Sequence, residues 1–275
     1  QGLDALPAAL QDAYTFMEQR LGIHQIPEAA ISRNNQIFRK GCEALGWQSG
    51  PLKHNRSGCI GSGFCELGCA YDAKLNAARV LLPEAVAAGA RIVSGVRVQR
   101  IRHRLGTALG ILGIGPGGVP VRVDAKAVIL AASATGSAAI LLASGLEDPY
   151  NQVGAGLHLH PGASVGGYFP EPVRGWEGIP QSWECTEHLD PTTPEKRCWL
   201  LPVFAHPVGT AASLPGIGEQ HALWMSRYSH LAAASAMLHD HSTGRVLATS
   251  RGTPRIRYQL EKEDAAHLGR GLGHC

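Results

Sequence analysis

The chain has 275 residues, of which 44% are hydrophobic and 17% charged, and its formal net charge is +3. This length suits one large domain or two smaller ones. No apolar run approaches the roughly 18 residues of a membrane-spanning helix, and so small and dispersed a charge argues against nucleic-acid binding. Seven cysteines without the spacing of a disulfide framework favour a reducing, cytoplasmic compartment.

The first segment, residues 1–54, is predicted to be helical or irregular, with amphipathic helix spacing over residues 6–14. It begins at Gln1 rather than at a methionine. It contains no strand followed by a glycine-rich turn, the arrangement that holds a dinucleotide pyrophosphate in a Rossmann domain. We therefore expect the chain to be an internal part of a longer protein.

The most unusual segment places Cys59, Cys65 and Cys69 within eleven residues, separated by glycines. Three cysteines threaded between glycines predict a tight loop that serves as a functional site rather than a simple connection. The spacing Cys-x5-Cys-x3-Cys differs from that of zinc fingers and zinc ribbons. Three thiolates in a glycine-rich turn are compatible with an iron–sulfur cluster, and the alternative is a packed loop without metal. Three of the four other cysteines, Cys42, Cys185 and Cys198, are predicted to be buried and inert.

An α/β pattern follows, from residue 73 to residue 145. A helix is expected over residues 73–88, broken at Pro83, and an alternating strand over residues 91–101. The continuous apolar run at residues 126–132 is typical of a strand buried on both faces, and residues 136–144 predict a helix that ends at Gly145.

One glycine cluster in this region, Gly113-Ile-Gly-Pro-Gly-Gly118, has the letters of a dinucleotide-binding turn. The alternating residues 119–123 directly after it indicate another strand rather than a helix. We therefore predict a hairpin of residues 108–114 and 119–123, and no cofactor turn.

From residue 151 onward, prolines and glycines become frequent. Strands are predicted at residues 197–206, 244–249 and 255–260, with one helix over residues 221–238. This predicts an antiparallel sheet with irregular connections. His158 and His160 fall on alternate positions of a predicted strand at residues 157–161, and His239 and His241 flank Asp240. Neither pair has further ligands at a spacing that supports a metal site.

The cysteine segment, C-x-G-x-G-x-C-x-x-G-C-x-x-x-A-K over residues 59–74, resembles the central motif of one branch of the glucose–methanol–choline (GMC) oxidoreductases. That branch includes long-chain alcohol oxidases and bacterial FAD-dependent sugar and polyol dehydrogenases. Further similar segments follow in the family's order, at residues 82–90, 128–137, 141–146, 153–161 and 254–258.

This resemblance implies an α/β portion of an FAD domain joined to an α+β substrate domain with an antiparallel sheet, the N-terminal Rossmann turn being absent. It divides the chain into residues 1–54, a partial FAD domain at 55–150 and a partial substrate domain at 151–275. It also implies that Val98, Ala132 and Ser133 contact FAD, that His160 shapes the junction of the two domains, and that the catalytic histidine lies outside the chain.

The function implied is hydride transfer from the CH–OH group of a small alcohol, polyol or sugar to the flavin, with the chain inactive by itself. Relatives with three cysteines in this spacing imply a three-iron cluster on Cys59, Cys65 and Cys69. The alternative is an iron–sulfur electron-transfer or assembly subunit without catalysis of its own. The sequence identifies neither the substrate nor the electron acceptor.

Overall fold

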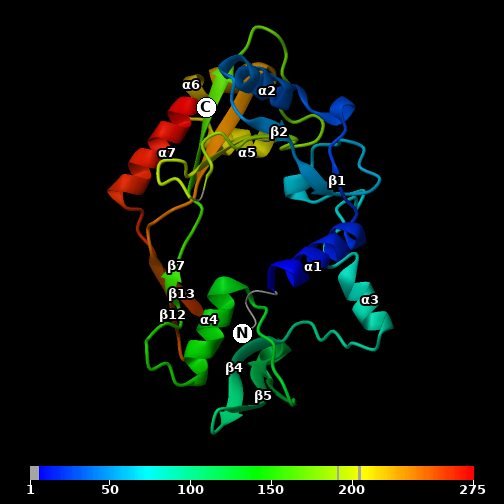
Figure 1. Cartoon of the computed structure of the whole chain (residues 1–275), viewed down its shortest axis with the longest axis vertical. Helices are drawn as coiled ribbons and strands as arrows, with labels where there is room; N and C mark the ends of the chain where they lie inside the picture. The colour runs from blue at the N-terminus through cyan, green and yellow to red at the C-terminus, as the bar shows by residue number, and fades with distance from the viewer. Residues whose placement is uncertain (1–5, 191, 204–205) are drawn as a thin grey trace. The chain divides into compact units, whose positions relative to one another are not determined.

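A computed structural model describes residues 6–190, 192–203 and 206–275 (Figure 1). The chain forms two compact units. The first unit holds the residues up to Ala90, Pro161–His239 and Ala266–Cys275, and the second holds Arg91–His160 and Asp240–Ala265. The units are interleaved along the chain, whereas the sequence predicted three consecutive segments.

The first unit is built on a five-stranded antiparallel sheet in the order β2-β9-β10-β11-β8. Helix α2 (Arg33–Leu45) packs against this sheet and buries Cys42 with Leu200 and Leu238. The predicted antiparallel sheet is thus confirmed, although residues 204–205 of one predicted strand lie outside the described residues. The strands are β2 (Ser49–Pro51), β8 (Gly162–Tyr168), β9 (Trp183–Cys185), β10 (Cys198–Pro202) and β11 (Leu231–Leu238).

The predicted helix over residues 221–238 is wrong in its second half. Helix α6 (Glu219–Ser226) ends early, and β11 follows after a short turn. Every second residue of β11 from Ala232 to Leu238 is buried. The strand is hydrogen-bonded to β10 on one side and to β8 on the other. The alanine-rich composition favours a helix locally, but pairing on both sides of a central strand overrides that preference.

Short elements complete the first unit. The predicted N-terminal helix is confirmed as α1 (Leu6–Arg20). Helix α3 (Leu81–Ala87) is shorter than predicted and carries Pro83 in its first turn, where a missing N–H costs no helical hydrogen bond. The remaining elements are β1 (Ile23–Gln25), β3 (Lys53–Asn55), α5 (Pro207–Ser213) and α7 (Lys262–His274), the last of which begins in the second unit.

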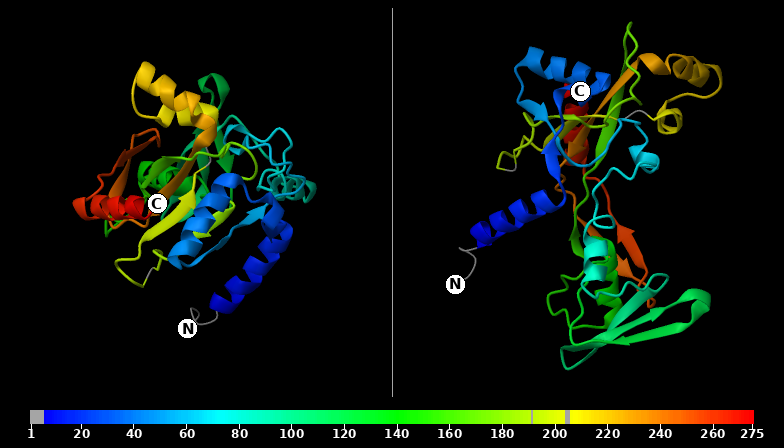
Figure 2. Two further views of the ribbon diagram at one scale, coloured as in Figure 1. Left: turned by 90° about the horizontal axis from the view of Figure 1, so that it is seen from above. Right: turned by 90° about the vertical axis from the view of Figure 1, so that its right-hand side faces the viewer.

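The second unit contains the predicted hairpin, β5 (Thr107–Ile114) and β6 (Pro120–Asp124), extended on the other side of β5 by β4 (Arg97–Arg104) (Figure 2). Gly110 is required here, because its φ is +137° and a Cβ would lie 1.9 Å from the Val123 carbonyl oxygen. The second half of the Gly113–Gly118 cluster connects the two strands through a short 3-10 turn at Pro116–Gly118, and β6 follows it as predicted.

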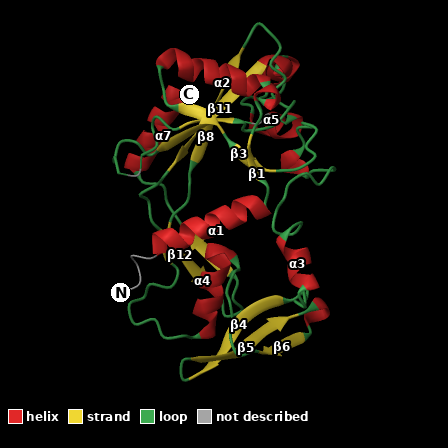
Figure 3. Cartoon of the chain, turned by 45° about the vertical axis from the view of Figure 1, so that its right-hand side comes forward, coloured by secondary structure: helices red, strands yellow, loops and turns green. Residues whose placement is uncertain are grey.

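Helix α4 (Ser133–Ser144) packs on β4 and on a second antiparallel sheet in the order β13-β12-β7 (Figure 3). Its predicted end at Gly145 is confirmed, since Gly145 has a φ of +67°. The strands are β7 (Ala155–Leu157), β12 (Gly244–Ala248) and β13 (Pro254–Arg257).

One further strand prediction for this unit is wrong, because residues 126–132 form no strand and Ile129 is 91% exposed. The strand predicted over residues 91–101 is confirmed in its second half by β4, whereas residues 91–96 precede β4 without pairing. Both runs have the composition of strands, but a strand exists only where a neighbour accepts its hydrogen bonds, and none does so in the described chain. Strand β7 ends at Leu157, so His158 and His160 lie beyond it rather than on one strand face.

Candidate functional site

The cysteine loop (residues 58–72) is closed at its base by a short antiparallel ladder. Ser57 N–H donates to the Ala73 carbonyl at 2.8 Å, and Leu75 N–H donates to the Asn55 carbonyl at 2.9 Å. Residues 73–75, on one side of this ladder, were predicted to begin the helix over residues 73–88, so that part of the prediction is wrong. The loop turns sharply because all four of its glycines have φ between +65° and +103°. The predicted tight loop is confirmed.

All three loop cysteines line one pocket of about 510 Å3, the cysteine pocket, together with His54 and Lys74. Cys59 and Cys65 are exposed, and Cys69 is half-buried. No group of three or more metal-ligating side chains gathers anywhere in the described residues. The three thiols therefore share a pocket without forming a ready ligand set, and the iron–sulfur cluster stays a prediction.

Burial and a neighbouring arginine together determine the protonation of His54 in the cysteine pocket. Burial, and then the nearby Arg56 guanidinium, lower the pKa of His54 below its ordinary value. His54 Nε2 lies 3.2 Å from the Gln181 carbonyl oxygen, which the neutral ring satisfies as a donor. The imidazole is thus held in its neutral form at one wall of the pocket.

The remaining predicted cysteines, Cys42, Cys185 and Cys198, are buried in the core of the first unit, as expected. A hydrogen bond to Cys185, followed by burial, raises the pKa of Cys42, and burial raises the pKa of Cys198. Raised values keep these two thiols protonated, so they pack as small apolar groups.

Ala132 and Ser133, predicted to contact FAD, lie at the start of α4 in the second unit, and both are exposed. The helix has no side-chain cap. Ser133 has a φ of +64°, in the left-handed region that favours glycine. The N-terminal end of α4 therefore offers small side chains and helix N–H groups to a ligand that approaches the backbone.

Val98, the third predicted FAD contact, lies on β4 opposite Gly113. The pairing of β4 with β5 shifts register between Val98 and Arg100, which is a β-bulge. Helix α4 and β4 are joined at the far end of the helix, where Ile101 N–H donates to Ser144 Oγ at 2.8 Å. Val98, Ala132 and Ser133 thus belong to one unit, and their contact with a cofactor stays a prediction.

The sequence did not predict a buried carboxylate at Asp240, whose Oδ2 accepts hydrogen bonds from Tyr258 Oη at 2.5 Å and from Leu159 N–H at 3.1 Å. His158 Nδ1 is 3.9 Å from Asp240 Oδ1. Tyr258 lies in the family-like segment 254–258, and His158 and Leu159 lie in the family-like segment 153–161. His160 lies beside this network in sequence, and its junction role stays a prediction.

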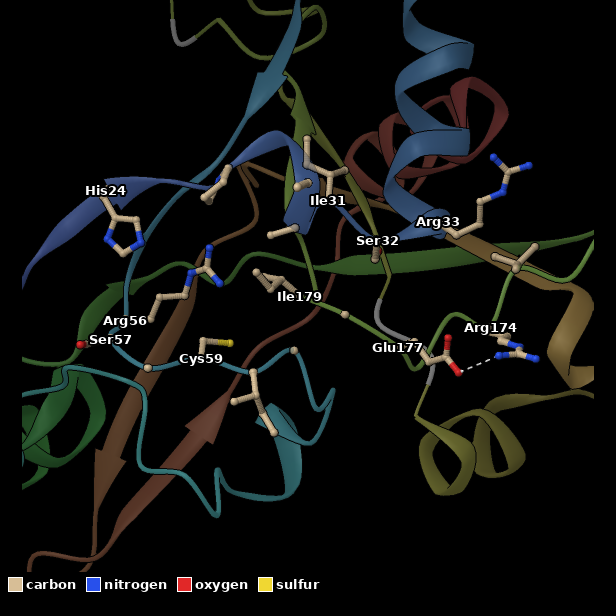
Figure 4. A pocket seen from close by; sticks show the side chains of 18 residues that line it. His24, Ile31, Ser32, Arg33, Arg56, Ser57, Cys59, Arg174, Glu177 and Ile179 are labelled. Atoms are coloured by element: carbon tan, nitrogen blue, oxygen red, sulfur yellow. Dashed lines mark hydrogen bonds and ion pairs between the residues drawn. The ribbon is translucent and has the colours of Figure 1, made fainter.

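A second feature that the sequence did not predict is a basic pocket of about 640 Å3 in the first unit (Figure 4). Its lining includes Arg33, Arg56 and Arg174. These arginines come from distant parts of the chain, and no local motif joins them.

The comparison with known proteins identifies the family. The family model described as GMC oxidoreductase matches residues 2–162, and the chain belongs to this family. An uncharacterized GMC-type oxidoreductase of Mycobacterium tuberculosis is 34% identical over 266 residues, which cover 96% of this chain and 40% of that protein. Long-chain-alcohol oxidase FAO4B of Arabidopsis thaliana is 27% identical over 256 residues, covering 86% of this chain and 33% of the oxidase.

The fold agrees with this assignment. The crystal structure of pyridoxine 4-oxidase from Mesorbium loti matches with a TM-score of 0.66 at 17% identity, covering 91% of this chain and 51% of that chain. The chain thus spans 40% or less of the length of the two curated relatives described. No helix among the described residues has the length and apolar character needed to cross a membrane.

Proposed function

We propose that this chain is part of an FAD-dependent oxidoreductase that oxidises a CH–OH group. The observation that carries the proposal is the GMC family match over residues 2–162, which includes the cysteine loop and the start of α4. The family binds FAD, and the flavin, when bound, supplies the hydride acceptor.

The residues at the start of α4 fit such a cofactor. Ala132 and Ser133 are exposed and small, so a flat ligand can approach their backbone closely. The N-cap residue, Ala132, makes no side-chain capping hydrogen bond, and the positive end of the helix favours an electron-rich group. In this proposal Ala132, Ser133 and the β4 residue Val98 position the cofactor, and no residue of the described chain is assigned as the catalytic base.

The substrate proposed is a small alcohol, polyol or sugar. Similarity to plant enzymes named long-chain-alcohol oxidases favours an alcohol within this class. The electron acceptor is left open by this similarity, because oxidases and dehydrogenases share the flavin chemistry.

The test uses the full product of the reading frame that encodes this chain. A visible flavin spectrum and reduction of that flavin by 1-dodecanol, sorbitol or glucose under anaerobic conditions are expected. Subsequent addition of oxygen or of a dye acceptor separates an oxidase from a dehydrogenase. Protein that carries flavin but is reduced by none of the three compounds would contradict the proposed substrate class.

The matched variants are Ala132→Phe, which places a bulky ring at the proposed contact, and Ala87→Phe at an exposed position of α3. The first is expected to lower flavin content, and the second to leave it unchanged. Equal flavin content in both variants would show that the start of α4 does not hold the cofactor.

The proposal also includes a three-iron cluster bound by Cys59, Cys65 and Cys69. What supports it is that Cys59, Cys65 and Cys69 line a single pocket. Because the described thiols do not form a ligand set, the cluster is assigned no part in the reaction, and iron content decides the matter.

A further inference from the structure

The basic pocket of the first unit is formed by the beginning of α2, the start of the cysteine loop and the segment at residues 173–179. Three arginines line it, Arg33, Arg56 and Arg174, against one acidic residue, Glu177, so the formal charge of the lining is +2 with its histidine neutral. A cavity of about 640 Å3 is within the size range of small-molecule sites.

Two of these arginines have no acidic partner. Arg174 Nη1 lies 3.4 Å from Glu177 Oε1, whereas neither Arg33 nor Arg56 lies in an ion pair within the described part of the chain. Figure 4 shows Arg56 on the His24 side of the pocket and Arg33 and Arg174 on the opposite side. Each side of the pocket thus carries an arginine without an ion pair among the described residues.

The most specific signal is the side chain of Arg56. Its Nε is buried and has no hydrogen-bond partner among the described residues. A buried donor without a partner costs free energy, and a donor on a guanidinium costs more than a neutral one. The Nη groups of Arg56 are not among these buried unpaired atoms, so an oxygen atom of an anion in the pocket can contact them and balance the charge of the guanidinium.

The start of α2 adds positive potential to the same wall. Ser32 is the N-cap residue, but its Oγ accepts a hydrogen bond from Asn35 Nδ2 at 2.7 Å and does not cap the first turn. The first N–H groups of this 13-residue helix thus lack a side-chain acceptor. Their partial charges reinforce those of Arg33, which is the first residue of the helix.

The walls of the pocket are fixed by backbone pairing. Gly178 N–H donates to the Gly61 carbonyl at 3.0 Å, and parallel bridges join Ser62 to Gly178 and Ile31 to Ile179. Gly178 has a φ of +85°, and a Cβ there would lie 3.1 Å from the Ser32 Cβ. The hydrogen bond and the two bridges join the segment at residues 173–179 both to the cysteine loop and to the residues before α2, so the pocket is formed before a ligand binds.

We propose that this pocket binds a small organic anion through a carboxylate or phosphate group, with Arg56 and Arg33 as the principal donors. The planar guanidinium presents paired N–H groups that match the oxygens of either anion. This site goes beyond the proposed flavin chemistry and does not depend on it, because none of its residues belongs to the predicted flavin contacts.

The experiment measures binding by isothermal titration calorimetry with the full product of the reading frame. The probes are glycerate, glycerol 3-phosphate and uncharged glycerol, which share a carbon skeleton and differ in charge. Saturable binding of at least one anion is expected, weakened by added salt, with no binding of glycerol. Binding of glycerate alone identifies a carboxylate site, and binding of glycerol 3-phosphate alone identifies a phosphate site.

Arg56→Gln and Arg33→Gln are each expected to weaken anion binding by about tenfold or more, because a charge-assisted hydrogen bond is lost. The matched control is Lys40→Gln, which removes the same charge from an exposed position of α2 outside the pocket. It is expected to leave the affinity within about twofold, since exposed charges at a distance are screened.

Arg56→Lys keeps the charge and guards against a folding defect, and it is expected to bind more weakly than the unmodified protein but more tightly than Arg56→Gln. Circular dichroism checks the fold of each variant. The proposal is overturned if neither anion saturates, if glycerol binds equally well, or if Lys40→Gln weakens binding as much as both arginine variants do. Flavin content is recorded separately, so a failure of the proposed function leaves this test intact.

Discussion

Asn35 is the polar side chain whose removal should cost the first unit most. It lies on α2, is 2% exposed, and its Oδ1 accepts hydrogen bonds from Ser182 N–H at 2.8 Å and Trp183 N–H at 3.0 Å. Its Nδ2 donates to Ser32 Oγ. One side chain thus joins the helix to the strand segment that enters β9. Asn35→Ala removes all of these bonds and leaves two buried backbone N–H groups without an acceptor.

The expected loss follows from that count. An unsatisfied buried donor costs about 1–3 kcal/mol, so two of them give a loss of about 2–6 kcal/mol in the free energy of unfolding. The matched control is Asn76→Ala. Asn76 is exposed, and its Oδ1 accepts only a local bond from Arg79 N–H at 3.0 Å. Its loss is expected to stay below about 1 kcal/mol.

Urea unfolding followed by circular dichroism and tryptophan fluorescence measures both variants, and buried Trp183 lies directly at the altered contact. Because Asn35 holds Ser32 at the wall of the basic pocket, Asn35→Ala should also weaken anion binding in protein that remains folded. A loss for Asn35→Ala no larger than that for Asn76→Ala would refute the reasoning from buried hydrogen bonds.

Three further outcomes are expected. Ser133→Gly should raise the free energy of unfolding, measured by urea titration, by about 0.5–1 kcal/mol, because a φ of +64° strains serine and not glycine. A variant less stable than the unmodified protein would contradict this. The lowered pKa of His54 means that the folded state disfavours its protonated form, so stability is full above the ordinary histidine pKa of about 6.5 and falls as the pH drops below it. His54→Gln should flatten this acid dependence in urea titrations, and an unchanged slope would exclude His54 as its source. Iron in anaerobically purified protein should be lost on Cys65→Ser and kept on Cys185→Ser, whereas iron-free, fully active protein would exclude the cluster.

Local features of the fold could be predicted from the sequence because their causes are local. The cysteine loop follows from its glycines, and the end of α4 follows from Gly145. The hairpin of β5 and β6 follows from alternation on both sides of a glycine cluster, which also excluded a cofactor turn at that cluster.

Features that depend on distant partners could not be predicted. β11 is a strand because β8 and β10 lie on either side of it, although its residues favour a helix. The run at residues 126–132 has the composition of a strand but no neighbour to pair with in the described chain. The basic pocket brings Arg33 and Arg56 together with Arg174, which lies more than a hundred positions further along the chain. In each case the presence or absence of a long-range contact, which no local pattern indicates, decides the outcome.

The basic pocket and the cysteine pocket are not independent, because Arg56, Cys59 and Ile179 line both of them. Metal binding requires the loop cysteines as thiolates, and a thiolate at Cys59 places negative charge beside the Arg56 guanidinium. That charge opposes the entry of an anion into the neighbouring pocket. If the cysteines hold iron, removal of the iron with a chelator should therefore strengthen glycerate or glycerol 3-phosphate binding, and Cys59→Ser should abolish this difference. An affinity that does not change with iron content would show that the shared residues leave the two sites uncoupled.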